Sequence, residues 1–317
     1  MEVASWLSAA PLPMGRLNHC LAASSTALYV IGGYTFPPPQ YMSSVLRGDG
    51  ASPWTEMPPM IAPRDSFGCG VVGDDTLVAA GGESIVTPFM LSAVETLNLS
   101  SKDAKWRKVA NLHNARQGHS AAVLGGLLYV AGGIDANGAV QGSVEAFNAT
   151  TNLWNRGPSL RVPRTYHGLA ASLGSLYAIG GRNGTSDSLM VLSSVEAFTV
   201  SGGGWREVAP MPEARERMAV ATSLDGAIYV VGGCPAQRVG HDAPCDVLLD
   251  SVLIFTPPGS SSSSSSNSND GVGVWTRAPS VPNPNAWLGA AFLGSNLFAV
   301  GGGLFYGRNE TYQLAVA

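Results

Sequence analysis

Residues 116–154 read RQGHSAAVLGGLLYVAGGIDANGAVQGSVEAFNATTNLW. Four short runs of apolar and β-branched residues in this stretch are separated by Gly, Asn and Ser, the residues that favour tight turns. One apolar run ends in the pair Gly132 and Gly133, a Val-Glu-x-aromatic run begins at Val144, and the last run contains Trp154. The pattern predicts one antiparallel sheet of four strands.

The same pattern occurs six times along the chain of 317 residues. The first glycines of the six pairs are Gly32, Gly81, Gly132, Gly180, Gly232 and Gly301. Before each pair, by 16 or 17 residues, lie Arg16, Arg64, Arg116, Arg164, Arg215 and Asn285. Ten residues before each of these lie Trp6, Trp54, Trp106, Trp154, Trp205 and Trp275. A four-stranded unit that recurs about every 50 residues predicts the blades of a β-propeller.

The order of Arg, Gly-Gly, Val-Glu-x-aromatic and Trp resembles the Kelch repeat, and it extends from Trp6 to Tyr312. The resemblance implies an all-β fold in which residues 1–317 form a single kelch propeller domain. It has six blades, led by Arg16, Arg64, Arg116, Arg164, Arg215 and Asn285.

The last repeat lacks its own tryptophan strand, because the chain ends seven residues after Glu310. Trp6, in contrast, has no repeat before it. We therefore expect residues 2–8 to complete blade six and to close the ring, which leaves no open sheet edge. No BTB-like, BACK-like or F-box-like segment precedes Trp6, so we expect a bare propeller.

Charge and composition argue against several classes of partner. The chain has 18 basic and 22 acidic residues, a formal net charge of −4, and no basic footprint for nucleic acid. The sequence contains no run of 18 apolar residues, so we expect no membrane span, and we recognise no secretion signal. The four cysteines are too few for a disulfide framework and suit a reducing compartment, so we expect a cytoplasmic or nuclear protein.

Most of the repeated residues have a structural interpretation. The six tryptophans are expected to pack between blades, and the repeat arginines to pair with the Glu of the Val-Glu run. His19, His119 and His167 each lie three residues after a repeat arginine, so packing explains them better than zinc binding. His241 and Asp242 lie between Cys234 and Cys245, but this spacing matches no standard metal site. We therefore expect neither a metal nor another cofactor.

Function is expected where the repeats differ from one another. Residues after the Gly pairs and after the repeat arginines should share one face of the propeller, because strands alternate in direction. The candidate ligand-binding residues there are Tyr34, Asp65, Glu83, Gln117, Tyr166, Arg182, Arg217 and Trp287. In the Kelch-like substrate receptors that the chain resembles, residues at these positions contact a bound peptide, and Tyr34, Arg182 and Arg217 match them in residue type. Their Asp-Gly and Ser signatures are missing here, so particular ligand specificities do not carry over.

These residues predict a protein-interaction module that binds a peptide or loop of a partner, with no catalytic residues. Arg182 and Arg217 should point toward a common region and hold an Asp, a Glu or a phosphorylated residue. The alternative is a kelch-type enzyme, an epimerase or oxidase acting on a sugar or another small molecule, with Glu83 or Glu216 beside Arg217 as an acid–base pair. The serine-rich segment 259–271 is expected to be a flexible loop on the opposite face. The sequence contains no information on the oligomeric state.

Overall fold

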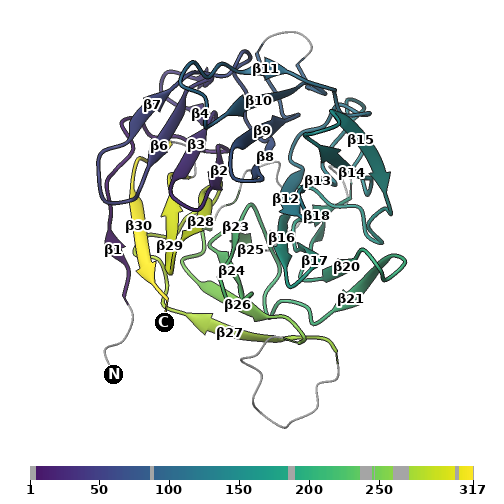
Figure 1. Ribbon diagram of the computed structural model, residues 1–317. Helices are drawn as coiled ribbons and strands as arrows, with labels where there is room; N and C mark the ends of the chain where they lie inside the picture. The colour runs from purple at the N-terminus through teal and green to yellow at the C-terminus, as the bar shows by residue number, and fades with distance from the viewer. Residues whose placement is uncertain are drawn as a thin grey trace.

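The computed structural model describes residues 5–85, 89–184, 190–235, 245, 247–259, 271–303 and 307–316. These residues form six four-stranded antiparallel sheets around a central axis (Figure 1). Every element in the described ranges is a strand, and these ranges contain no apolar helix of membrane-spanning length. The predicted six-bladed, all-β propeller is confirmed.

Each blade runs outward from the axis in chain order. Blade one consists of β2 (Cys20–Ala23), β3 (Leu28–Ile31), β6 (Val45–Gly48) and β7 (Thr55–Met57), with the hairpin β4 (Tyr34–Thr35) and β5 (Gln40–Tyr41). Blade two consists of β8 (Gly68–Val72), β9 (Thr76–Ala80), β10 (Val94–Asn98) and β11 (Arg107–Lys108). Blade three consists of β12 (Ser120–Leu124), β13 (Leu127–Ala131), β14 (Val144–Asn148) and β15 (Leu153–Gly157).

The remaining blades repeat this order. Blade four consists of β16 (Gly168–Ser172), β17 (Ser175–Ile179), β20 (Val195–Thr199) and β21 (Trp205–Val208), with the hairpin β18 (Arg182–Asn183) and β19 (Met190–Val191). Blade five consists of β23 (Ala219–Thr222), β24 (Ile228–Val231), β26 (Val252–Thr256) and β27 (Val274–Ala278), with β22 (Arg215–Glu216) paired to β25 (Cys234–Pro235). Blade six consists of β28 (Gly289–Leu293), β29 (Asn296–Val300), β30 (Thr311–Ala315) and β1 (Leu7–Ser8).

The apolar run before each Gly pair forms the second strand of its blade. In β3 and β17 every residue is buried, because neighbouring blades cover both faces of the sheet. The Gly pair ends this strand where backbones of two blades meet. Gly132 has a φ of 67°, and a Cβ there would collide with the carbonyl oxygen of Arg164 in the next blade. A side chain at this position is therefore excluded by both backbone conformation and space.

Buried ion pairs join the repeat arginine to the Val-Glu run in three blades, as predicted. The Arg Nη2 to Glu Oε1 distances are 2.5 Å for Arg64–Glu95, 2.7 Å for Arg116–Glu145 and 2.6 Å for Arg164–Glu196. Each of these arginines also donates to the carbonyl of the first glycine of its pair. Each Arg–Glu ion pair, with this hydrogen bond, thus holds the turn after the second strand against the segment that leads into the blade.

The other three blades use different chemistry at this position. Arg215 pairs with Glu213 at 2.9 Å, and Asn285 donates to the Gly301 carbonyl at 2.7 Å. Arg16 has no carboxylate partner among the described residues, and burial lowers the pKa of its guanidinium to about 10. The hydrogen bond to the carbonyl of the first glycine is therefore common to all six blades, whereas the carboxylate partner of the repeat residue differs between blades.

The N-terminal strand closes the ring. In Figure 1, β1 runs beside β30, with Leu7 opposite Gln313 and Ser8 opposite Tyr312. The Trp6 indole donates to the Pro279 carbonyl at 2.8 Å. The other five repeat tryptophans make the equivalent bond to the connection that enters their blade, at 2.8–2.9 Å. Residues 2–4 of the predicted strand lie outside the described residues.

The expectation about the cysteines is wrong. Cys20 is bonded to Cys69 across strands β2 and β8 of neighbouring blades, and Cys234 is bonded to Cys245. Disulfides persist in oxidising environments, so the cysteines no longer support a reducing compartment. Cys20 and Cys69 are 49 residues apart, about one repeat, and only the fold brings them together. Residues 260–270 of the serine-rich segment, and His241 and Asp242, lie outside the described residues.

The three repeat histidines are buried at interfaces between blades. His119 Nε2 accepts a hydrogen bond from the Gly68 backbone N–H at 3.0 Å, whereas the ring nitrogens of His19 and His167 have no partner within the described residues. Burial, with the charge of Arg16 or Arg116 nearby, lowers the pKa of His19 and of His119 to about 3. Where the chain is described, no group of three or more His, Cys, Asp or Glu side chains is placed to hold a metal ion.

Removing residues 1–9 should destabilise the domain by several kcal/mol, because the ring loses both the β1–β30 pairing and the partly buried Trp6, and loss of a fully buried Trp costs about 3–5 kcal/mol. Chemical denaturation of the truncated and full chains measures this difference. Trp6→Phe, which keeps the strand and loses the indole hydrogen bond, should fall between them. An unchanged unfolding midpoint after truncation would contradict the role of β1 in closing the ring.

The buried histidines should make stability fall with acidity. The unfolded chain protonates the His19 and His119 imidazoles near pH 6.5, but the folded chain resists their protonation until about pH 3, so their contribution to stability is complete above pH 6.5 and decreases below it. At pH 5 each of these histidines should lower the free energy of unfolding by about 2 kcal/mol relative to pH 7.

Blades two, five and six supply the matched control, because Phe67, Met218 and Leu288 occupy the same repeat position. A His19→Met variant should therefore fold and should lose about 2 kcal/mol less than the parent between pH 7 and pH 5. Equal losses for the two proteins, measured by urea unfolding, would refute this explanation.

Candidate functional site

Backbone bridges bring the two predicted sets of residues together on one face, which we call the mouth face. The residue after each repeat arginine pairs with the residue after the same blade's Gly pair in blades one to four, as Leu17–Tyr34, Asp65–Glu83, Gln117–Ile134 and Thr165–Arg182. In blade five the bridge is extended into the ladder β22–β25, with Glu216 opposite Cys234. All eight candidate residues lie on this face or in the ring of residues described next.

Six backbone hydrogen bonds form a closed ring at the axis. The residue two positions after each repeat arginine or asparagine donates its N–H to the carbonyl of its equivalent in the preceding blade, at 2.7–3.1 Å. The members are Asn18, Ser66, Gly118, Tyr166, Arg217 and Trp287. All six have positive φ, between 50° and 61°. Every blade therefore presents one residue to the mouth in the same backbone conformation.

The ring has a small half and a large half. Blades one to three present Asn18, Ser66 and Gly118, whereas blades four to six present Tyr166, Arg217 and Trp287. These six residues line a cavity of about 120 Å³ at the axis. Sequence reasoning identified the three large members and missed the three small ones, although their shared spacing from the repeat arginine is a usable signal.

A stack of cations and rings occupies the large half. The Arg217 guanidinium carbon lies 4.8 Å from the centre of the Tyr166 ring and 4.7 Å from the Trp287 ring. The Arg182 guanidinium lies 4.9 Å from the same Tyr166 ring. Such contacts hold guanidinium groups in a fixed orientation and stabilise them by about 0.5–2 kcal/mol each. The pKa of Arg217 is nevertheless lower than its ordinary value, mainly because the guanidinium is buried.

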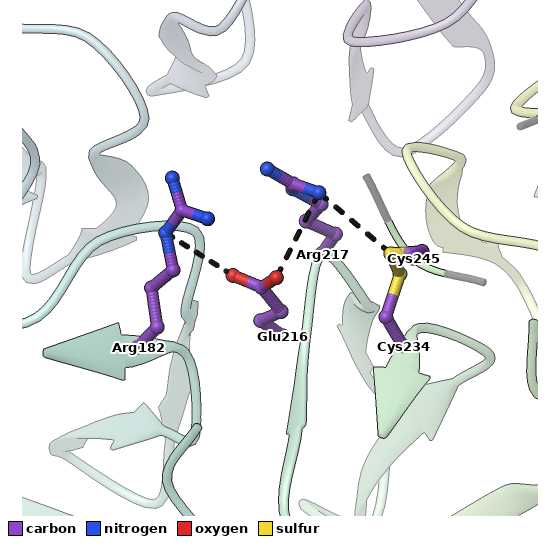
Figure 2. Close-up of a disulfide and its surroundings, with 5 residues drawn as sticks. All are labelled: Arg182, Glu216, Arg217, Cys234 and Cys245. Carbon is purple, nitrogen blue, oxygen red and sulfur yellow. Dashed lines mark hydrogen bonds and ion pairs between the residues drawn. A yellow bond between two sulfur atoms is a disulfide. The ribbon is translucent and has the colours of Figure 1, made fainter. Parts of the chain in front are cut away.

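One buried carboxylate lies between the two arginines (Figure 2). Glu216 Oε2 is 3.4 Å from Arg182 Nε, and its Oε1 is 3.7 Å from Arg217 Nη1. In Figure 2 the ion pair from Arg182 to Glu216 starts at Nε, and neither Nη atom of Arg182 is joined to Glu216. Neither of these Nη atoms has a hydrogen-bond partner among the described residues, whereas Arg217 also has a side-chain hydrogen bond with Tyr166. Two guanidinium groups thus share a single carboxylate and keep donors free.

Blade two carries the opposite charge. Asp65 is buried beside Glu83, and it accepts a hydrogen bond from the Asn18 amide at 3.2 Å. Burial, together with the Glu83 carboxylate, raises the pKa of Asp65 well above its usual range. The Tyr41 hydroxyl donates to Glu83 Oε1 at 3.1 Å, and burial with this carboxylate raises the Tyr41 pKa. The mouth face is therefore acidic at blade two and basic at blades four and five.

Two predicted members lie apart from the arginine stack. The Tyr34 ring packs edge to face on Tyr41 at 5.3 Å, so it adjoins the acidic side of the mouth. Gln117 lies on blade three, where it pairs with Ile134. Of the three aromatic candidate residues, only Tyr166 and Trp287 contact the arginines.

Adding a methyl group at Gly118 should disturb the ring. A Cβ there would lie 2.6 Å from Thr165 Oγ1 and 3.1 Å from the Tyr166 ring, whereas a Cβ at Gly125 would meet nothing within 4 Å. Both glycines have φ near 60°, so Gly118→Ala and Gly125→Ala share the backbone strain. Gly118→Ala should cost about 1–3 kcal/mol more, the usual penalty of overpacking, in chemical denaturation. Equal costs would show that the ring tolerates a side chain at blade three.

Comparisons with known proteins agree with this architecture. The family described as the KLHDC2/KLHL20/DRC7 Kelch-repeats domain matches residues 18–233. Kelch-like protein 36 of Bos taurus is 29% identical over 242 residues, which cover 72% of this chain and 37% of that protein. Kelch-like protein 36 of Rattus norvegicus is 28% identical, with 92% of this chain and 44% of that protein covered.

A relative matched over a shorter region and a solved structure extend the comparison. Beta-scruin of Limulus polyphemus is 30% identical over 48% of this chain and 17% of its own length. The structure of YjhT superposes with a TM-score of 0.75 at 13% identity and covers 97% of this chain and 96% of YjhT, which supports the fold alone. The chain spans less than half the length of each of these curated relatives. By its repeat pattern, its blades and the match over residues 18–233, the chain belongs to the Kelch-repeat family.

Proposed function

We propose that this chain is a protein-interaction domain that binds an acidic segment of a partner across the mouth face, over blades four and five. Its kinship with Kelch-like proteins favours a protein partner. The observation that carries the proposal is the shared carboxylate, because two arginines with one buried acid between them retain a net positive charge and free Nη donors. Guanidinium groups bind carboxylates and phosphates through such paired donors.

Exposed apolar side chains support a protein partner rather than a small molecule. The loops after the Gly pairs expose five large apolar residues on the mouth face, namely Phe36, Ile85, Phe89, Met190 and Val247. Ile85 and Met190 expose 77% and 64% of their surface. The axial cavity at the mouth holds about 120 Å³ and the adjoining one along the inner strands about 170 Å³, each below the roughly 300 Å³ at which small-molecule sites begin. A partner that lies across the face and inserts one side chain suits both features.

The charge distribution gives the proposed complex an orientation. The carboxyl pair of Asp65 and Glu83 offers an acidic residue no favourable partner at blade two, whereas Arg182 and Arg217 would attract it at blades four and five. The rings of Tyr166 and Trp287 lie against the Arg217 guanidinium and keep it from turning into solvent. We therefore place the acidic residue of the partner above Glu216, within reach of the free Nη atoms.

Arg182→Ala, Arg217→Ala should abolish this interaction. The test uses a fluorescein-labelled nonapeptide rich in Asp and Glu, its Asn/Gln counterpart and a phosphoserine version, with binding followed by fluorescence anisotropy. The acidic peptides should bind the parent, and the double variant should bind them at least 100-fold more weakly, since losing one member of a charge pair at an interface costs about 2–5 kcal/mol. The Asn/Gln peptide should bind neither protein.

The exposed pair Arg107 and Arg156, on β11 and β15, supplies a control that removes the same charge elsewhere. Arg107→Ala, Arg156→Ala should bind like the parent. Arg182→Lys, Arg217→Lys should recover only part of the affinity, because an ammonium cannot donate as a fork. Unchanged affinity in a folded Arg182→Ala, Arg217→Ala protein would eliminate the proposed site.

A further inference from the structure

A disulfide lies directly beside the basic half of the mouth. Cys234 follows the Gly pair of blade five and pairs through its backbone with Glu216. It is bonded to Cys245, 11 residues further along the chain. The two cysteines expose 0% and 1% of their surface, so the bond is part of the packed structure rather than a surface link.

The disulfide contacts two residues of the candidate site. Cys245 Sγ is 3.7 Å from Arg217 Nη1, as Figure 2 shows. Cys234 and Cys245 form a small apolar cluster with Ala286, against which Leu248 and Trp287 pack. Trp287 in turn lies on the Arg217 guanidinium. The Arg217 side chain is thus held by the disulfide and Glu216 at one end and by aromatic rings on its faces.

Arg182, the other arginine of the site, lacks such a brace. It is held by the Tyr166 ring and by Glu216 alone, and no cysteine lies near it among the described residues. Blade five also differs from blades one to four, where the bridge beside the ring is a single residue pair rather than a ladder. The extra backbone pairing and the disulfide occur together in the blade that carries Arg217.

We infer that the Cys234–Cys245 disulfide is a positioning element for Arg217, and that affinity for an acidic segment depends on the thiol–disulfide state of this pair. The inference rests on the proposed function. A cross-link restricts the chain that it closes, and without it Arg217 and Trp287 would have to be ordered when the ligand binds. The cost of ordering one or two long side chains corresponds to about a tenfold loss of affinity.

The chemical step is thiol–disulfide exchange with a dithiol. One thiolate of the dithiol attacks a protein sulfur and breaks the protein S–S bond, and its second thiolate then releases the mixed disulfide. The protein gains two electrons and two protons as two thiols, and the dithiol becomes a disulfide. Because Cys234 and Cys245 are buried, the reductant reaches them only after local opening of blade five.

The second disulfide of the chain supplies the matched control. Cys20 and Cys69 join the inner strands of blades one and two, away from Arg217. Cys234→Ala, Cys245→Ala should bind the Asp/Glu nonapeptide about tenfold more weakly than the parent, and Cys20→Ala, Cys69→Ala should bind it like the parent. In the latter protein dithiothreitol can reduce only the Cys234–Cys245 bond, and its addition should reproduce the tenfold loss.

Hydrogen exchange separates this inference from the proposed function. The Arg217 and Trp287 amides belong to the ring, and they should exchange at least tenfold faster without the Cys234–Cys245 bond, whereas the Ser66 and Gly118 amides should keep their rates. If the parent does not bind the peptide, the proposed function fails, and so does the coupling of affinity to this bond. If the peptide binds but neither loss of the bond nor reduction changes its affinity, the inference alone is overturned. Unchanged exchange at Arg217 and Trp287 would also overturn it, and the dithiothreitol measurement decides the matter if the alanine variant does not fold.

Discussion

The closed ring of backbone hydrogen bonds at the axis is the constraint on which the mouth of this propeller depends. Six N–H groups each bond to the neighbouring blade's carbonyl, and the circuit closes only if all six residues adopt the left-handed conformation. Because the bonds use backbone atoms alone, they set no requirement on side-chain chemistry. The ring therefore fixes the position of one residue from each blade and lets the side chain differ from blade to blade, except at Gly118, where a Cβ would clash.

The repeat arginines serve the scaffold, and this explains why other arginines are available for binding. Arg64, Arg116 and Arg164 are buried, and their donors are satisfied mainly by a carboxylate and by the carbonyls at the Gly pair. Arg182 and Arg217 lie at non-repeated positions and share a single acid. The repeat arginines and the two mouth arginines thus have different roles. The fold uses most of the hydrogen-bond donors of the first set and fewer of those of the second.

Sequence spacing predicts this fold well because strand order and turn position recur with the repeat. The spacing of the repeat residues predicts the six blades and the place of Trp6 in blade six. In the structure β1 lies beside β30, as that spacing predicts. The ring could not be predicted from residue types, since Asn, Ser, Gly, Tyr, Arg and Trp share no chemistry. The disulfides were missed because the cysteines were considered by number and local spacing, although Cys20 and Cys69 lie four and five residues after successive repeat arginines. Sequence position does not reveal which side chains meet across the axis, so it could not separate Tyr34, which packs on Tyr41, from the residues of the arginine stack.

Backbone strain offers an independent argument about where function lies. The left-handed conformation costs little for Gly or Asn, as at Gly118 and Asn18, but about 1 kcal/mol or more for bulky residues. Blades four, five and six nevertheless hold Tyr166, Arg217 and Trp287 in it. Closing the ring requires only the backbone, so smaller residues would serve the scaffold at lower cost. Strained residues of this kind cluster at functional sites, and three of them in adjacent blades support the proposal that their side chains, rather than the ring itself, contact the partner.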